Sequence, residues 1–161
     1  MAVDMFIKID GIDGESKDSK HEGEIDVLAW SWGVSQSGTM HGAGGGGAGK
    51  ANYQDLSFTM WKEKAAAALL FHCASGKHIK EATLVVRKAG EDPLEYLKIK
   101  MSDILVSSVS AGGSGGEDRL TMNVSLNFAK IEYEYQEQNA KGKAEGGPKK
   151  FGWDIKKNEK V

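Results

Sequence analysis

The chain has 161 residues, 40% of them hydrophobic and four of them tryptophan, which suits a single domain over residues 1–161 with a buried core. Its 21 basic and 23 acidic residues give a formal net charge of −2, which excludes a strong attraction to nucleic acid or to an anionic membrane. The first ten residues include the charged Asp4, Lys8 and Asp10 and lack the apolar stretch of a signal peptide. We therefore expect no nucleic-acid partner, no membrane insertion, folding in the cytosol, and any export by a leaderless route.

Apolar and polar residues alternate along most of the chain, which is the period of a β-strand with one buried face. The predicted strands cover residues 3–9, 28–34, 56–60, 82–86, 97–101, 120–135 and 151–155. The buried face changes side near Val27, near Asp103 and around Ala129 and Lys130, which predicts bulges or bends. Such bends let a sheet fold over on itself, so we predict a mainly β protein: a compact antiparallel β-barrel of two bent sheets with one flanking α-helix.

An acidic segment with two glycines follows the first predicted strand, at residues 10–18. It lacks the twelve-residue spacing ending in glutamate that a calcium loop needs, and Lys17 dilutes its charge. We predict a solvated turn and no metal site.

The second predicted strand has two different faces. Trp30 and Trp32 share one of them, and we expect both tryptophans in the core. The other face carries the small residues Ala29, Ser31 and Gly33. This stripe is either ordinary solvent-exposed surface or the lining of a channel in a ring-shaped assembly.

Two segments are rich in glycine. The shorter, residues 111–116, predicts a mobile hairpin tip between strands. The longer, residues 37–50, contains the glycine and lysine skeleton of a phosphate-binding loop, but Ala51 stands where the magnesium-binding Ser or Thr belongs, and a strand follows it. Because such a segment buries little apolar surface, we predict a flexible arm that contacts another subunit. Its expected contact residues are Met40, His41, Gly42, Gly44, Gly45, Gly46, Gly47 and Lys50.

Residues 62–74 are predicted to form a helix because they consist mostly of strong helix formers, and the following Gly76 suits a helix end. The side expected to face the barrel contains Ala66, Leu69, Leu70 and Cys73. Apolar residues continue around the helix at Ala67, Phe71 and Ala74, too far for a helix with one side in water. We predict that these last three residues contact a neighbouring subunit.

His72, Cys73 and His78 lie close together in the sequence but do not predict a metal or catalytic site. Adjacent helical residues point about 100° apart, and no acidic ligand is suitably spaced. Cys73 lies on the apolar side of the helix, where a thiol is usually a small hydrophobe, and as the single cysteine it cannot form an intrachain disulfide. We expect no cofactor and no enzyme activity; a hydrolase using Cys73 with His72 or His78 is the enzymatic alternative.

Short motifs spread along the chain point to one family. They are DMFIKI at 4–9, GESK at 14–17, IDVLAWSWG at 25–33, the glycine-rich arm, DLSFT at 55–59, ASGKH at 74–78, RKAG at 87–90, LVSS at 105–108, GGSGGEDRL at 112–120 and GWDI at 152–155. In this order the chain resembles the hemolysin-coregulated protein (Hcp) family, the inner-tube subunit of bacterial type VI secretion systems.

The resemblance implies a β-barrel that assembles head to tail into a hexameric ring. Rings stack into a tube that a contractile sheath propels out of the cell, with a spike protein at its tip and small effectors in its lumen. By position, the resemblance implies that Ser31 and its stripe face the lumen, and that the arm, Gly90 and Lys157 make ring-stacking contacts. The non-enzymatic alternative is a free-standing β-barrel that binds a sugar or peptide, which would be a monomer with exposed tryptophans.

Overall fold

The computed structural model describes residues 2–42, 44, 46–47 and 49–161, which form ten strands and one helix. The strands are β1 (Val3–Ile9), β2 (Ile25–Ser31), β3 (Val34–Ser35), β4 (Asn52–Tyr53), β5 (Leu56–Trp61), β6 (Ile79–Lys88), β7 (Glu95–Ala111), β8 (Thr121–Tyr135), β9 (Lys149–Asp154) and β10 (Glu159–Lys160), and the helix is α1 (Ala65–Ser75). The helix is too short to span a membrane, so the described part of the chain contains no candidate transmembrane helix.

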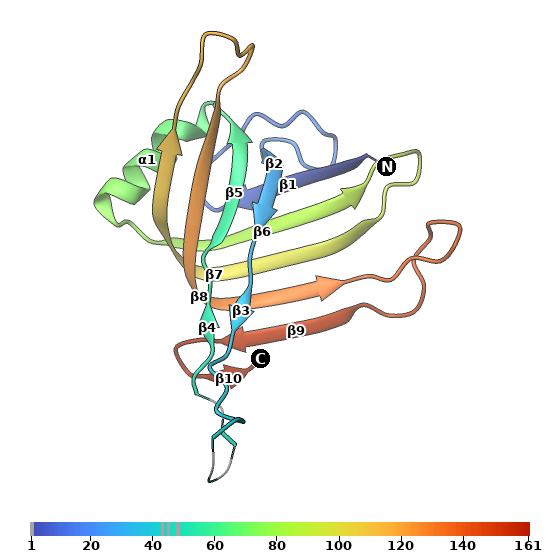
Figure 1. Ribbon diagram of the computed structural model, residues 1–161. Coiled ribbons are helices and arrows are strands. Elements are labelled where there is room, and N and C mark those ends of the chain that lie inside the picture. Colours follow the sequence, from blue (N-terminus) through green and yellow to red (C-terminus); the bar gives the residue numbers. More distant parts are fainter. Residues whose placement is uncertain (1, 43, 45, 48) are drawn as a thin grey trace.

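Six strands close into an antiparallel barrel in the order β8, β5, β2, β1, β6 and β7, with β7 pairing again with β8. Strands β9 and β10 extend the sheet beyond β8, and β3 and β4 form a separate ribbon. Figure 1 shows β2, β5, the start of β8 and the end of β7 as a front wall, crossing a rear wall of β1, β6 and the remaining parts of β7 and β8. The predicted mainly β barrel with a flanking helix is confirmed.

The long strands β7 and β8 pass from one wall to the other at the places that the sequence predicted. In β7 the buried residues change from odd to even positions at Asp103, whose φ of 53° marks the bend. In β8 the buried residues change from even to odd positions between Phe128 and Ile131. The third predicted irregularity is a register shift between Val27 and Ala29 in β2. These three bends turn one continuous sheet into a closed barrel.

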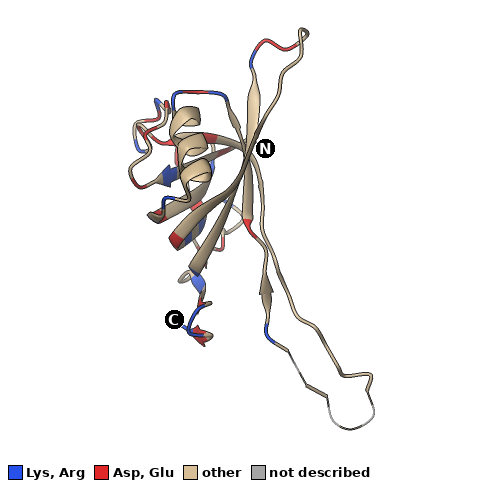
Figure 2. Cartoon of the chain, turned by 90° about the vertical axis from the view of Figure 1, so that its left-hand side faces the viewer, with Lys and Arg blue, Asp and Glu red and all other residues tan. Residues whose placement is uncertain are grey.

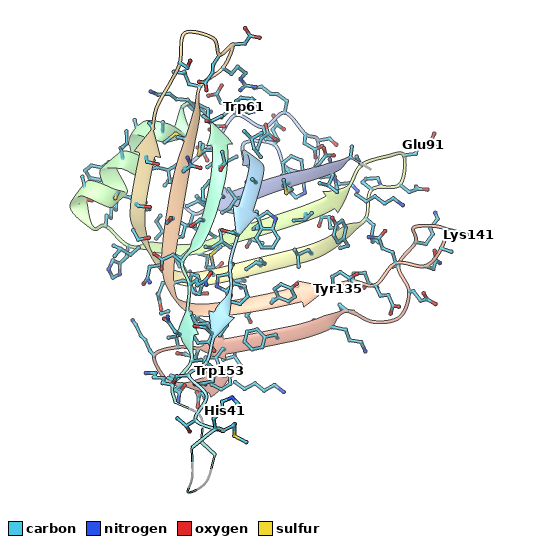
Figure 3. All side chains as sticks on the ribbon, viewed as in Figure 1. His41, Trp61, Glu91, Tyr135, Lys141 and Trp153 are labelled. Atoms are coloured by element: carbon cyan, nitrogen blue, oxygen red, sulfur yellow. The ribbon has the colours of Figure 1, made fainter. Side chains whose placement is uncertain are left out.

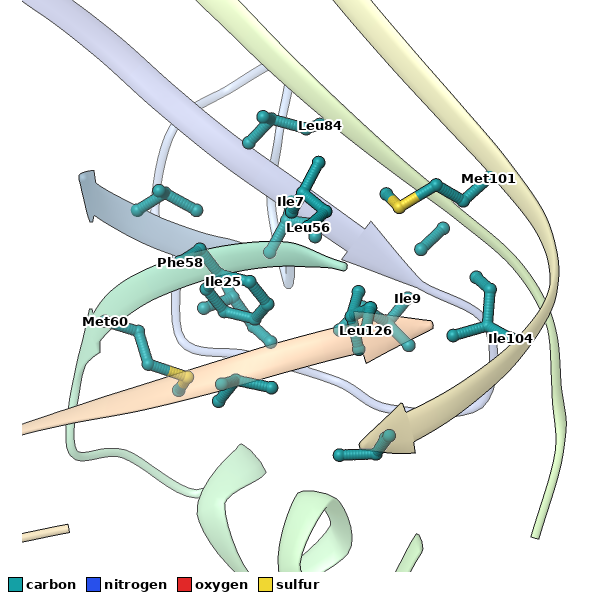
Figure 4. Packing of buried hydrophobic residues seen from close by; sticks show 14 of the residues in the cluster. Ile7, Ile9, Ile25, Leu56, Phe58, Met60, Leu84, Met101, Ile104 and Leu126 are labelled. Atoms are coloured by element: carbon teal, nitrogen blue, oxygen red, sulfur yellow. The ribbon is translucent and has the colours of Figure 1, made fainter. Parts of the chain in front are cut away.

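The core lies between the two walls and contains the alternating apolar residues of every barrel strand (Figure 4). Ile7, Leu56, Phe58, Leu84 and Leu126 are no more than 2% exposed. Burying a side chain of this kind contributes about 1.5–3 kcal/mol, so the core dominates the stability of the barrel.

Helix α1 begins at Ala65, three residues later than the predicted start at residue 62. The chain stays in extended pairing up to Lys62, whose N–H donates to the Leu120 carbonyl at 2.8 Å. The helix ends as expected at Gly76, which has a φ of 70°. The expectation that Leu70 faces the barrel is wrong, since Leu70 is 49% exposed. Ala66 and Leu69 are buried and Cys73 is partly buried, because the buried side is centred on Ala65, Ala66, Leu69 and His72.

The segment at residues 10–24, here called the clamped loop, is solvated at Asp10, Asp13 and Glu15 as the sequence predicted, but Asp18 is bound to the barrel. Arg87 on β6 donates two hydrogen bonds to Asp18, at 2.7 and 2.9 Å, and one to Asp4 at 3.0 Å. The hydrogen bond from Arg87 lowers the pKa of Asp18 from its ordinary value of 3.8 to about 2. The same ion pair raises the pKa of Arg87. A carboxylate of the loop is therefore held against the barrel wall.

A histidine anchors the other end of the clamped loop. The His21 ring nitrogens lie 3.0 Å from the Glu24 carboxylate and 2.7 Å from that of Glu95 on β7. The ring also stacks on Phe6, with ring centroids 4.4 Å apart, and His21 is only 7% exposed. The clamped loop therefore packs against the barrel through a buried side chain.

Candidate assembly surfaces

The outward surface of the front wall consists mostly of small, uncharged residues, and its one carboxylate beside β5, Asp55, accepts hydrogen bonds from Ser107 and Asn127. Ala29 and Ser31 are exposed, and Gly33, just past the strand, is partly exposed. Strand register continues this stripe across four strands in two rows, Ser31–Ser57–Ser125–Ser108 and Ala29–Thr59–Asn123–Ser110. We call these eight residues the polar face. Two hydrogen bonds link its strands, Ser57 Oγ to Ser125 Oγ at 3.0 Å and Thr59 Oγ1 to Asn123 Oδ1 at 2.7 Å.

The rear wall presents a different outward surface. There Lys98, Lys100 and Glu132 stand out from adjacent strands, and Lys100 lies 3.6 Å from Glu81 and 3.9 Å from Glu132. Figure 2 shows the contrast, with the front wall almost entirely uncoloured and the charged residues gathered on the other side and at the loops. Of the polar face, only Ala29 and Ser31 were predicted from the sequence; the predicted Gly33 lies just beyond it, and the other six members were missed. The sequence pattern that could have revealed those on β5 and β8 is the polar residue between successive core positions, for example Ser57 between Leu56 and Phe58.

The glycine-rich arm projects away from the barrel below the front wall (Figures 1 and 2). Its sides are joined by Thr39, which exchanges backbone and side-chain hydrogen bonds with Gly47 at 2.7–3.2 Å. Met40 is 76% exposed. The other described contact candidates are also exposed, namely His41, Gly42, Gly44, Gly46, Gly47 and Lys50, whereas Gly45 lies outside the described residues. The arm is an extended hairpin, and its role as a contact stays a prediction.

Gly90 and Lys157 occupy two tight turns at opposite ends of the molecule. Gly90, with a φ of 139°, lies between β6 and β7, and Lys157 lies in the β9–β10 turn, where its N–H donates to Asp154 Oδ1 at 3.0 Å. Figure 1 shows the first turn at the upper right and the second at the lower left, and Figure 3 labels the neighbouring Glu91 and Trp153. Within one chain the two turns are far apart, so a contact between them requires two chains.

The exposed side of α1 is apolar up to Ala74, and only Ser75 at the end of the helix is polar. Ala67, Leu70, Phe71 and Ala74 follow the i, i+3, i+4, i+7 spacing of one helix face, and we call them the helix stripe. Leu70 is 49% exposed and Phe71 is 58% exposed. The structure therefore brings the three predicted helix residues together and adds Leu70.

Trp30 and Trp32 are partly buried and not fully inside the core as the sequence predicted. The register shift at Val27 and Ala29 changes the buried face of β2, and beyond Ser31 the chain leaves the barrel, so each tryptophan packs on the core with one side only. With Val34, Tyr133 and Phe151 they line an open pocket of about 460 Å³, which we call the aromatic groove.

The two residues of α1 that could have carried a reaction, His72 and Cys73, pack against the core instead. His72 is buried and its Nδ1 donates to the carbonyl of Ala68 at 2.8 Å, whereas His78 is exposed. In the part of the chain that the structure describes, no three His, Cys, Asp or Glu side chains gather as a possible metal site.

A sequence profile described as "Type VI secretion system effector, Hcp" matches residues 6–135. The chain belongs to this Hcp family. Protein hcp1 of Pseudomonas aeruginosa is 62% identical to it over 159 residues, covering 98% of both chains. Members of the family are structural tube proteins of the type VI secretion system and not enzymes.

Solved Hcp structures share the fold over the full chain. Hcp1 from Salmonella typhimurium has a TM-score of 0.83 and 43% identity, covering 100% of both chains. A structure described as a type six secretion system protein has a TM-score of 0.94 and 31% identity, covering 99% of this chain and 100% of its own. The family resemblance inferred from the sequence is confirmed.

Proposed function

We propose that this Hcp chain forms hexameric rings that stack into the inner tube of a type VI secretion system and leave the cell carrying small effectors. The observation that carries the proposal is the pair of apolar surfaces on different elements, the helix stripe on α1 and the aromatic groove between β2, β3, β8 and β9. A contact between two different surfaces of identical chains is heterologous, and it closes into a ring when the rotation per subunit closes.

The helix stripe fits the groove in chemistry. Phe71 and Leu70 project apolar side chains without a charge among them, and the groove offers the faces of Trp30, Trp32 and Tyr133. An apolar helix face in a hydrophobic groove is a recurrent recognition mode, and removing both apolar surfaces from water favours the association. Ring closure by this contact would cover both surfaces on every subunit.

The ring is tested first by light-scattering chromatography with negative-stain images of the same peak. We expect six chain masses and ring-shaped particles for the wild type, and smaller species for Phe71→Asp, because a carboxylate would be buried in the groove. Ala140→Asp, in the exposed loop between β8 and β9, adds the same charge and should keep the ring.

A mixing experiment tests which surface meets which. Phe71→Asp retains the groove and Phe151→Asp retains the helix stripe, so each variant alone should stay monomeric while a mixture forms dimers of one each. Dimers that form only in the mixture, and with neither variant by itself, support the stripe-in-groove contact. Dimers formed equally by each variant alone would show that each surface contacts itself, which contradicts a ring.

We propose that the polar face lines the lumen, as the resemblance implies for Ser31, Ala29 and Gly33. Its hydroxyls and amides carry no charge, which suits passage of effectors of either sign. Ser31→Trp should keep the ring mass and reduce the amount of small secreted proteins that co-purify with rings. Thr83→Trp, on the outward side of β6, is the matched control, and loss of rings with Ser31→Trp would instead assign Ser31 to the fold.

We assign ring stacking to the arm, Gly90 and Lys157, whose turns lie at opposite ends of the barrel. Deleting Gly44–Gly47 should leave hexamers intact and weaken tube formation, measured by sedimentation and electron microscopy of concentrated rings. Unchanged tubes would remove the arm from this role. The spike, the sheath and the effectors are the partners that this proposal implies.

One observation supports the alternative of a free-standing binding module, namely the partial exposure of Trp30 and Trp32 in the groove. Such a module would elute as a monomer, and its tryptophan fluorescence would change on adding a sugar or peptide. The same mass measurement therefore separates the two functions.

A further inference from the structure

The hairpin between β7 and β8, residues 112–120, carries two unpaired acidic residues. It rises from the end of the front wall opposite the arm (Figures 1 and 2). Arg119 is held at the base of the hairpin, with its guanidinium 4.4 Å from the centre of the Trp61 ring. Glu117 and Asp118 are exposed, and no basic side chain of the described residues lies within 4.0 Å of them. We call residues 112–120 the acidic tip.

The other end of the front wall has the opposite charge. Lys50 lines a pocket of about 470 Å³ at the base of the arm, together with Tyr53, Trp153 and Asn158. This pocket adjoins the aromatic groove and shares Val34 and Phe151 with it. Lys156 lies in the β9–β10 turn that contributes Asn158 to this pocket. Both lysines are exposed and neither has an acidic partner within the described ranges. The pocket has aromatic walls and one lysine in its lining, Lys50, with Lys156 in the adjoining turn; we call it the basic pocket.

We infer that the acidic tip of each subunit docks at the basic pocket of a subunit in the next ring, so that a second copy of this chain is its partner. This inference rests on the proposed stacking and deepens it. The tip and the pocket lie at opposite ends of one β-wall, so copies stacked along that wall in the same orientation bring the two surfaces together.

Charge gives the stack a direction. Two rings that meet with the same end would place Glu117 and Asp118 against their own copies, or Lys50 against Lys50, and like charges repel. Rings that meet tip to pocket place opposite charges within a screening length of about 8–10 Å at ordinary salt. The contact repeats around the ring, so pairs that are individually weak add up to a strong orientation preference.

The test uses purified rings and reads two quantities separately. Light scattering gives the ring mass, and the concentration dependence of the diffusion coefficient gives ring–ring attraction at about 0.05 M and about 0.5 M salt. Glu117→Lys with Asp118→Lys, and separately Lys50→Glu with Lys156→Glu, should keep the ring mass. Each should weaken ring–ring association by at least about tenfold at low salt. Combining all four substitutions restores the net charge and should restore association to within about threefold of the wild type.

A matched control carries Glu137→Lys with Glu145→Lys, two exposed acidic residues in the loop between β8 and β9. It changes the net charge as much as the tip variant and should associate like the wild type. The tip-to-pocket contact would be overturned if the four-residue swap failed to restore ring–ring association, or if the control weakened that association as much as the tip variant does. Either result would leave the proposed ring itself intact. A wild-type chain without a ring peak would overturn the proposed function and the inference with it.

Discussion

The clamped loop and the arm are both glycine-containing excursions between strands, yet only one of them belongs to the barrel. The clamped loop sends Asp18 to Arg87 on β6 and His21 to Glu95 on β7. The arm is closed mainly by its own hydrogen bonds, as between Thr39 and Gly47. The difference teaches that side chains able to reach charged or aromatic partners, and not loop length, decide whether an excursion is part of the folded body. It also leaves the arm free for contacts outside the chain.

The largest effect is expected from removing the anchor of the clamped loop. Arg87→Met should lower the free energy of unfolding by about 1.5–3 kcal/mol, because it removes the charge-assisted hydrogen bonds from Arg87 to Asp18 and Asp4. Urea unfolding of the variant and the wild type measures this loss of stability. Lys98→Met, which removes an exposed pair 3.5 Å from Glu95, should cost no more than about 1 kcal/mol. Equal costs for the two variants would mean that the ion pair does not hold the loop.

Two glycine substitutions sharpen the comparison. A Cβ at Gly14 in the clamped loop would overlap the backbone carbonyl of Glu24, so Gly14→Ala should cost about 1–3 kcal/mol of stability. A Cβ at Gly49 in the arm would lie 2.6 Å from Ser37 Oγ, a side-chain atom that can rotate away. Gly49→Ala should therefore change the unfolding free energy by less than about 0.5 kcal/mol. Equal costs in urea unfolding would show that the arm is as tightly packed as the clamped loop.

The clamped loop also predicts a pH dependence. The pKa of Asp18 is lowered from 3.8 to about 2 by the hydrogen bond from Arg87, so the ionised carboxylate stabilises the fold above pH 4. This stabilisation is lost as the pH falls through about 2. Asp18→Asn should be less stable than the wild type at neutral pH, with the gap closing in that acid window. A gap that stays constant with pH, in thermal unfolding at several pH values, would contradict the ion pair.

The smallest effect is expected from shortening the arm. Deleting Gly44–Gly47 should leave the free energy of unfolding within about 0.5 kcal/mol, because the described part of the arm contributes no side chain to the core. A clear drop in the thermal midpoint would show that the arm supports the barrel.

Local sequence patterns were sufficient for the barrel. The alternation of Leu56, Phe58 and Met60 gives the buried face of β5, and the changes of buried face near Asp103 and Ala129 locate the bends of the longest strands. Helix α1 was found from its composition, but its start was missed because the pairing of Lys62 with Leu120 depends on a strand far along the chain.

Features that depend on distant partners were not predictable. Asp18 and Arg87 are 69 positions apart, and His21 and Glu95 are 74 apart, so no local pattern reveals the clamped loop. The polar face was found only on β2, because its other rows depend on which strands become neighbours. Trp30 and Trp32 were expected in the core because alternation gives the side of a strand but not where the covering wall ends.

The bent strands β7 and β8 have a consequence for how the barrel comes apart. Each passes through both walls, and the two remain paired along nearly their whole length, from Leu97 with Tyr135 to Ala111 with Met122. Neither wall can peel away without breaking this shared ladder, so there is no weak seam between them. We expect partial opening to be confined to the arm, the acidic tip and the short strand β10. The slowest-exchanging amides of both walls should report one cooperative transition.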